Sequence, residues 1–225
     1  MSGSGPAPGD GRPPDWQAPS PTKALLENRR YAWMVGVLAA VLVVGFLVYA
    51  LTHHSSGAGT PGVAVGQRLR YFSAPLATSD LNGDANLSPP CTRAHHDPRA
   101  LNVCLLARRG PLVLGFFVPG SQACEREVST MQALASEPLT WGAQYAAVAV
   151  NTGHAAAAKA VRRHGWTIPV AYDADGGVGG LYGVTACPLL ELSYRGGTVA
   201  QRLIGEHWLS ESALSAEVQT LLRHG

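Results

Sequence analysis

The sequence predicts an α/β domain, in which helices flank a mixed central sheet, behind a single N-terminal transmembrane helix. The transmembrane prediction rests on residues 31–51, an apolar run that contains no charged side chain. The sheet prediction rests on continuous apolar runs at 111–118 and 145–151, which are typical of strands buried on both faces. Strands and helices then alternate before a hairpin and a closing helix. The sheet is therefore expected to be parallel at first and antiparallel at its end.

The apolar run at 31–51 is long enough to cross a bilayer as one helix. Its basic flanking residues, Lys23, Arg29 and Arg30, all precede it, and the next basic residue is Arg68. The positive-inside rule places the N-terminus in the cytoplasm and everything after about residue 52 outside, with membrane lipid as the partner of the run. The alternative is a cleaved signal peptide, but the run is longer than a typical signal-peptide core and no small-x-small cleavage site follows it.

Composition divides the rest of the chain. Residues 1–30 are rich in Gly, Pro and Ser and are expected to form a disordered cytoplasmic tail. Residues 52–66 have the composition of a flexible tether. Residues 67–225 are expected to form the folded domain, with a turn-rich, irregular insertion at about 80–108. The net charge of +2 gives no sign of the strongly basic surface that nucleic-acid-binding proteins carry, so no nucleic acid is predicted as a partner.

Local patterns predict the remaining elements of the folded domain. A helix over 122–136 follows the first apolar strand, and a helix over 154–165 ends at Gly165. The segments "PLLELSY" and "TVAQRLI" flank "RGG", which indicates a β-hairpin over 188–204. The closing helix follows, with Ser210 as its expected N-cap.

All four cysteines lie in the part of the chain predicted to be extracytoplasmic, where disulfides persist. Cys91 and Cys104 are predicted to form a structural disulfide, which would close a loop of about a dozen residues and contribute about 2–3 kcal/mol. One alternative is a metal site with His95 and His96, which lie between them; another is redox exchange with the other two cysteines. The Cys/His spacing matches no standard zinc pattern, so no metal and no cofactor are predicted.

Cys124 is the candidate reactive residue. It shares one apolar helix face with Val128 and Met131, so it should point towards the sheet from the first turn of its helix. The N–H groups and the dipole of that turn would stabilise a thiolate; the alternative is an inert buried cysteine. Ser121 is expected to cap the helix by accepting a backbone N–H bond, or to bond the Cys124 thiolate or a bound peroxide. The charged residues 125–127 are expected to form a solvated face.

Two stretches together resemble a known family: "FFVPGSQAC" resembles the active-site turn, and "TACPLLELSYRGGTVAQRLIG" the cis-proline segment, of thioredoxin-like proteins. Over about residues 63–224 the chain is similar to membrane-anchored bacterial redoxins of the TlpA and AhpC/TSA type. The resemblance implies a thioredoxin-like fold and a cis bond before Pro188. It also implies that Cys187 lies beside the turn carrying Cys124, where the two would form a disulfide or redox couple. The expected location is the bacterial cell membrane, with one span and an extracytoplasmic folded domain.

Three positions depart from this family. Ser121 stands where the attacking cysteine belongs, Gly120 where a tryptophan often precedes it, and Gly115 where thioredoxin keeps a buried acid for proton transfer. These departures point away from ordinary dithiol chemistry. Peroxiredoxins have Thr or Ser three residues before their reactive cysteine and a proline upstream, and Pro119, Ser121 and Cys124 echo that pattern.

The leading functional prediction is an extracytoplasmic thiol–disulfide oxidoreductase-like protein. Cys124 would attack a protein disulfide or a peroxide, Cys187 would attack the resulting mixed disulfide or sulfenic acid, and an external reductant would reset the pair. One alternative is a peroxiredoxin-like thiol peroxidase with Cys124 as the peroxidatic cysteine. The other is a non-catalytic thioredoxin-fold module in which both disulfides are structural. The substrate and the reducing partner are not specified by the sequence.

Overall fold

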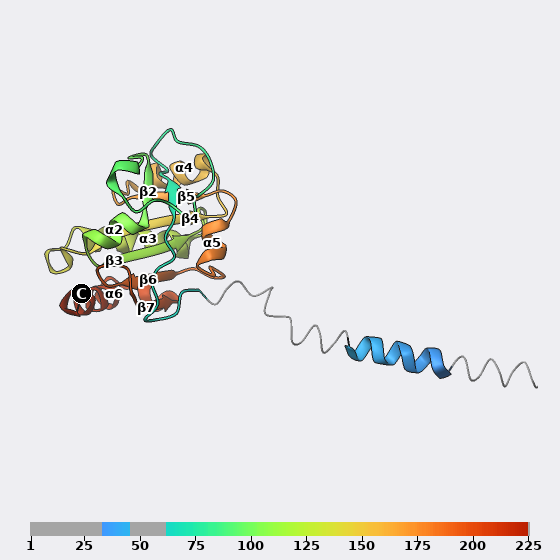
Figure 1. The fold of residues 1–225 in the computed structure, drawn as a ribbon. Coiled ribbons are helices and arrows are strands. Elements are labelled where there is room, and N and C mark those ends of the chain that lie inside the picture. Colours follow the sequence, from blue (N-terminus) through green and yellow to red (C-terminus); the bar gives the residue numbers. More distant parts are fainter. Residues whose placement is uncertain (1–32, 46–61, 225) are drawn as a thin grey trace, which may run out of the picture. The chain divides into compact units, whose positions relative to one another are not determined.

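The computed structural model describes residues 33–45 and 62–224, which belong to two separate compact units (Figure 1). Residues 33–45 form a helix inside the predicted membrane run. The rest of that run, the predicted tail and residues 52–61 of the predicted tether lie outside the described residues. Across the two described ranges, no helix has both the length and the hydropathy that a membrane crossing requires.

The folded unit is built on a mixed sheet with the strand order β5-β4-β3-β6-β7. β3, β4 and β5 run parallel, whereas β6 pairs antiparallel with both β3 and β7. The predicted mixed sheet is therefore confirmed, and the two apolar runs that predicted it correspond to β3 and β4. The strand bounds are β3 Leu112–Phe117, β4 Gln144–Val150, β5 Val170–Asp173, β6 Leu189–Ser193 and β7 Val199–Ile204.

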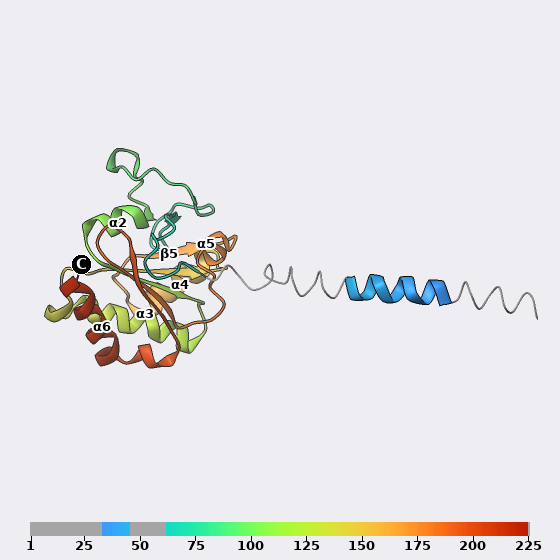
Figure 2. The ribbon, with the colours of Figure 1, turned by 60° about the horizontal axis from the view of Figure 1, so that its bottom comes forward.

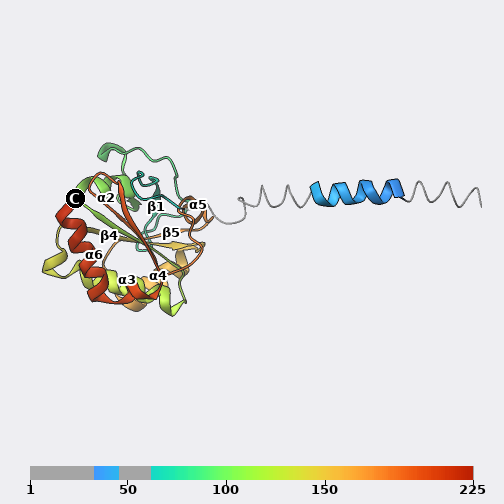
Figure 3. The same cartoon turned by 90° about the horizontal axis from the view of Figure 1, so that it is seen from below.

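Helices cover both faces of this sheet (Figure 2, Figure 3). On one face, α3, α4 and α6 bury an apolar cluster that includes Val128, Met131 and Leu214. On the other, α2 and α5 pack around a second cluster that includes Phe72 and Tyr182. The sheet is thus the middle layer between two cores. The helices are α2 Val103–Arg109, α3 Gln122–Ala135, α4 His154–His164, α5 Gly177–Leu181 and α6 Glu211–His224, with short 3-10 turns η2 Arg93–His95, η3 Pro138–Thr140 and η4 Glu206–Leu209.

The insertion predicted to be irregular at about 80–108 is irregular only in its first part. Ala100–Asn102 form β2, which pairs antiparallel with β1 (Ser73–Pro75), and α2 follows at once. Asn102 caps α2, because its side chain accepts a bond from the N–H of Leu105 at 3.2 Å. The next five residues, "VCLLA", are all buried, and this apolar run holds the segment in a regular helix. The turn-rich residues upstream concealed where this helix begins.

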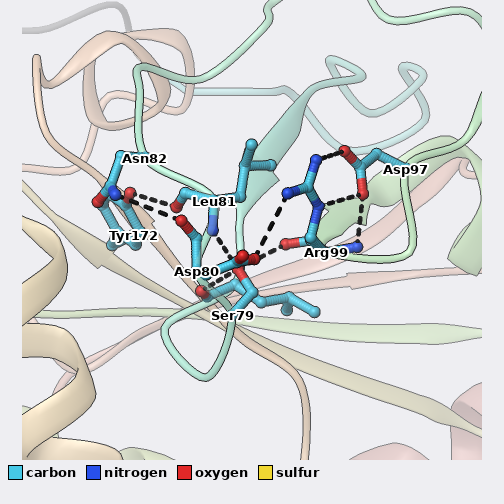
Figure 4. A network of polar contacts seen from close by, with 8 residues as sticks. Ser79, Asp80, Leu81, Asn82, Asp97, Arg99 and Tyr172 are labelled. Carbon is cyan, nitrogen blue, oxygen red and sulfur yellow. Dashed lines mark hydrogen bonds and ion pairs between the residues drawn. The ribbon is translucent and has the colours of Figure 1, made fainter.

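Polar contacts hold the loop between β1 and β2 in place (Figure 4). The hydroxyl of Tyr172, in β5, donates to the carbonyl of Leu81 at 2.9 Å. Arg99 forms ion pairs with Asp97 at 2.9 Å and with Asp80 at 3.4 Å. The hydrogen bond from Arg99 lowers the pKa of the exposed Asp97 carboxyl. The loop is therefore closed on itself and tied to the edge strand of the sheet.

Candidate functional site

Cys124 and Cys187 are joined by a disulfide, with their Cα atoms 5.3 Å apart. Cys124 lies in the first turn of α3, shortly after β3, and Cys187 lies just before β6. β3 and β6 are antiparallel neighbours with Phe116 opposite Leu189, so the end of one strand and the start of the other meet at the same edge of the sheet. The fold thereby brings together two cysteines that are 63 positions apart in the sequence.

The peptide bond between Cys187 and Pro188 is cis. The carbonyl of Pro188 accepts a bond from the N–H of Gly205, just beyond β7, at 3.1 Å. On the other side, the N–H of Leu189 donates to the side chain of Glu127 in α3 at 3.2 Å. The segment that carries Cys187 is therefore held both by the neighbouring strand and by the helix that carries Cys124.

The two cysteines differ in burial. Cys124 is only 2% exposed and belongs to the core between α3 and the sheet, as its helical spacing predicted. Cys187 is half-buried and packs against the edge of that core. Of the two residues, Cys187 is therefore the one with more surface open to solvent.

Ser121 occupies the N-cap position of α3, but its hydroxyl accepts no backbone N–H bond. The expected hydroxyl cap is therefore wrong, and the hydroxyl lies instead 2.9 Å from Sγ of Cys124. A disulfide sulfur carries no hydrogen, so in this state the hydroxyl is the donor. In the reduced protein the same hydroxyl is placed to donate to a Cys124 thiolate. The second expectation for Ser121, a bond to the sulfur, matches this geometry.

The expectation of a solvated face at residues 125–127 is wrong for two of its three members. Arg126 is exposed, but Glu125 and Glu127 are buried, and Glu127 has no exposed surface. Burial raises the pKa of Glu127 well above its ordinary value. Its Oε2 accepts the Leu189 N–H, whereas its Oε1 has no hydrogen-bond partner among the described residues. A buried carboxyl therefore lies on α3 three residues after Cys124. It also bonds the N–H of Leu189, which is two residues after Cys187.

Gly115, in the middle of β3, explains how Glu127 fits. An added Cβ on Gly115 would lie 3.1 Å from Glu127 Oε1 and 2.6 Å from the sulfur of Met131. A side chain at position 115 would therefore collide with the two residues that α3 places over the strand. The helix thus supplies a buried carboxyl to the space that the glycine leaves.

Glu125 fixes the turn before α3. Its Oε1 accepts the N–H of Gly120 at 2.8 Å, and its carboxylate forms ion pairs with Arg163 and, at 3.1 Å, with His164 at the end of α4. Burial acts to raise the pKa of Glu125, but the Gly120 N–H, His164 and Arg163 outweigh it and leave that pKa below its ordinary value. Gly120 has φ of +91°, a conformation that glycine adopts without strain. Glu125 thus ties the turn before α3 to α4.

The second disulfide lies elsewhere. Cys104, in the first turn of α2, is joined to Cys91 of the insertion, with the Cα atoms 5.7 Å apart. His95, between them, contacts Thr92, with 2.9 Å between its Nδ1 and the Thr92 hydroxyl. Within the described ranges, no group of three or more His, Cys, Asp or Glu side chains is arranged to hold a metal ion.

No protein-family model matches the chain, and no curated protein matches it. Solved structures do match it. The chain is 15% identical to a thiol:disulfide interchange protein of the thioredoxin family from Chlorobium tepidum, with a TM-score of 0.54 over 71% of this chain and 98% of that chain.

Two further matches come from Mycobacterium tuberculosis. One is a secreted disulfide oxidoreductase homologous to E. coli DsbE, 17% identical, with a TM-score of 0.51 over 66% of this chain and 94% of that chain. The other is the peroxidoxin BcpB, 17% identical, with a TM-score of 0.53 over 72% of this chain and 97% of that chain. Together with the sheet order, these similarities establish a thioredoxin-like fold.

Proposed function

We propose that the domain carries out thiol–disulfide exchange through Cys124 and Cys187. The observation that supports this most strongly is the asymmetry of their disulfide. Cys187 is half-buried, while Cys124 is buried in the first turn of α3, with the Ser121 hydroxyl 2.9 Å from its sulfur. Helix N–H groups and a donor hydroxyl stabilise a thiolate, and a stabilised thiolate is the better leaving group.

Reduction of the protein begins when a thiolate of an external dithiol attacks Sγ of Cys187. A new S–S bond forms between the reductant and Cys187, the Cys124–Cys187 bond breaks, and its electron pair leaves on Cys124 as a thiolate. The second thiolate of the reductant then attacks the mixed disulfide, releases Cys187 as a thiolate and departs as a disulfide. The sequence-based mechanism gave the first attack to Cys124, but the burial of Cys124 favours the opposite order.

The reduced protein runs the same steps on a substrate disulfide. Cys187 attacks one substrate sulfur, the other substrate sulfur leaves as a thiolate, and Cys124 then attacks Cys187 to release the substrate as a dithiol. Cys124 must lose its proton for this second attack. Glu127 in its ionised form can accept that proton, because it lies on the same buried helix face, and its raised pKa makes it a stronger base than an ordinary carboxylate.

We also propose that residues 31–51 anchor the chain in a bacterial cell membrane, with the folded domain outside. The bias of basic residues towards the N-terminal side of this run supports that orientation. The described helix at 33–45 carries exposed apolar side chains, including Trp33 and Leu42, and such a surface needs a cover of lipid or protein. The test is labelling of reduced intact cells with a membrane-impermeant maleimide, which should modify Cys187. Labelling only after cell lysis would contradict the orientation.

Mixed-disulfide trapping with the full chain tests the exchange mechanism. In Cys124→Ser, Cys187 should attack a small aromatic disulfide and remain as a stable adduct, detected by mass spectrometry. In Cys187→Ser, the buried Cys124 should form the adduct at least roughly tenfold more slowly. The reverse ranking would overturn the assigned order of attack. A wild-type Cys124–Cys187 bond that resists excess dithiothreitol in the folded protein would eliminate exchange and leave the non-catalytic module.

A thiol peroxidase is the second candidate, favoured by the contact between the Ser121 hydroxyl and the Cys124 sulfur. In this case Cys124 would attack peroxide, become a sulfenic acid with release of water, and be resolved by Cys187 to the observed disulfide. Dithiol-dependent consumption of hydrogen peroxide that is lost in Cys124→Ser would favour this candidate over disulfide exchange.

A further inference from the structure

Four arginines line one surface cavity of about 520 Å³ at the end of α2. Arg108 and Arg109 come from the last turn of α2, Arg93 from η2, and Arg195 from the turn between β6 and β7. Leu105 is the other lining residue, and no carboxylate lines the cavity. Three segments that are distant in the sequence thus contribute like charges to one site.

These charges are not neutralised within the described part of the chain. The ion pairs found there involve Arg99, Arg163, His164 and Arg202, and none of the four cavity arginines. A helix C-terminus attracts cations, and this accounts for Arg108 and Arg109. It does not account for Arg93 and Arg195, which other elements bring to the same cavity. Like charges in one cavity repel each other, so an anion bound among them relieves that repulsion.

Backbone carbonyls fix two of the guanidinium groups in place. Arg108 donates from Nη1 to the carbonyl of Cys91 at 2.8 Å, and Arg195 donates from Nε to the carbonyl of Arg108 at 3.3 Å. These bonds orient each side chain without neutralising its charge. The remaining N–H groups of each planar guanidinium stay available, and such forks match the geometry of phosphate oxygens.

The Cys91–Cys104 disulfide holds the cavity together. It ties the loop that contributes Arg93 and the Cys91 carbonyl to the helix that contributes Arg108 and Arg109. Breaking it would free the acceptor that positions Arg108. The predicted structural disulfide thus also acts as a support for the arginine cavity.

We propose that this arginine cavity binds a phosphate-bearing anion, in which oxygens of a phosphate or phosphate ester bond two or more of the four guanidinium groups. The ligand is either a free phosphate compound or the headgroup of an anionic lipid, since both present the same oxygens. The site is separate from Cys124 and Cys187 and does not depend on their chemistry.

Titration calorimetry of the full chain in neutral detergent, with pyrophosphate and inorganic phosphate as probes, tests the site. We expect pyrophosphate to bind more tightly than phosphate, and both to weaken as salt rises, because screening at 0.1 M salt acts over about 10 Å. Arg195→Gln should weaken binding at least roughly tenfold, since bonds between charged groups are the strong ones. Arg162→Gln, an exposed arginine of α4 outside the cavity, is the matched control and should change affinity less than about twofold.

A Cys91→Ser, Cys104→Ser double variant retains all four arginines in the sequence but should weaken pyrophosphate binding, because Arg108 loses its fixed position; if the variant fails to fold, Arg195→Gln alone decides. Short-chain phosphatidylglycerol below its micelle concentration distinguishes the sources. Tighter binding of this lipid than of pyrophosphate assigns a headgroup, and the reverse assigns a free phosphate compound. No binding of any probe at low salt, or equal losses in Arg195→Gln and Arg162→Gln, would overturn the proposal.

Discussion

The two disulfides of this molecule share one plan and differ in what surrounds them. In each, a buried cysteine in the first turn of a helix, Cys104 or Cys124, is joined to a half-buried cysteine in an irregular segment. The Cα separations, 5.7 and 5.3 Å, are nearly the same. Helix position and spacing therefore do not distinguish a structural bridge from a redox candidate.

The difference lies in the capping residue and in the buried acid. The side chain of Asn102 accepts the N–H of Leu105, as a cap does. It therefore gives no hydrogen-bond donor to the sulfur of Cys104 in α2. Ser121 leaves the backbone uncapped and faces the sulfur of Cys124. α3 also carries Glu127 on its buried face, whereas the buried residues of α2 are apolar. Side-chain chemistry around the sulfur, rather than the helix end itself, therefore distinguishes the redox candidate from the structural bridge.

The largest expected effect separates the two bridges by function. Cys187→Ser should abolish catalytic disulfide exchange, because it removes the less buried cysteine of the pair, while the Cys91→Ser, Cys104→Ser double variant should retain exchange. Turnover of a fluorescent disulfide substrate with a dithiol reductant measures both. If the double variant lost exchange as completely as Cys187→Ser, both bridges would be needed for exchange, and the functional difference between them would be contradicted.

The next effect separates them by stability. Loss of the Cys91–Cys104 bridge, which spans 13 positions, should lower the free energy of unfolding by about 3 kcal/mol in the chain-entropy model. Urea unfolding of the double variant and the wild type, both under non-reducing conditions, measures this difference. A loss well below about 1 kcal/mol would show that this bridge does not serve mainly to stabilise the fold.

Glu127→Gln sharpens the role of the buried acid. It keeps the shape and the acceptor for the Leu189 N–H but removes the proton acceptor, so exchange should slow by about a hundredfold, the low end of general acid–base effects. Stopped-flow reduction of substrate disulfide follows the rate. Glu137→Gln, which lies beyond the end of α3 at the N-cap of η3, is the control and should leave the rate unchanged.

The same substitution should change how stability depends on pH. In the unfolded chain Glu127 ionises near 4.5, whereas burial raises its pKa in the folded protein. The folded state therefore holds the proton when the unfolded state has lost it, and wild-type stability falls as pH rises above about 4.5. Glu127→Gln has no carboxyl at this position and does not lose stability in this way. The free energy of unfolding of the variant, measured with urea, should therefore rise relative to that of the wild type between pH 4.5 and pH 8. A constant difference across that range would contradict the raised pKa.

The smallest effect compares the two capping residues directly. Ser121→Ala should raise the pKa of the reduced Cys124 thiol by about one unit, by removing a hydroxyl donor to the thiolate. Asn102→Ala should instead cost about 1 kcal/mol of stability and leave the Cys124 pKa unchanged. Thiolate absorbance at 240 nm in a Cys187→Ser background and urea unfolding give the two readouts. Equal pKa shifts in both variants would erase the distinction between the caps.

The sequence predicted the sheet well because its signal is local. The apolar runs of β3 and β4 need no knowledge of the rest of the fold, since strands buried on both faces must be apolar throughout. The family resemblance, not the periodicity, placed Cys187 beside Cys124. It could do so because the active-site turn and the cis-proline segment keep their order along the chain.

The buried acids were missed because "ERE" has the composition of a solvated helix face. Their burial depends on partners that only the fold reveals: the space above Gly115 for Glu127, and Arg163 with His164 for Glu125. A signal was nevertheless present. Glu127 is three positions after Cys124, on the face predicted to be buried, and a glycine in the middle of a buried strand indicates a close approach by something else.

The placement of Glu127 on α3 has a consequence for design. Ser121, Cys124 and Glu127 fall within seven consecutive residues, so hydroxyl, sulfur and carboxyl move as one piece whenever the helix moves. Their relative positions depend on one stretch of helix, and the demand on the host strand is a glycine where Gly115 stands. A designer could transplant the segment to another helix facing a sheet, with one accessible cysteine on the adjoining strand to complete it.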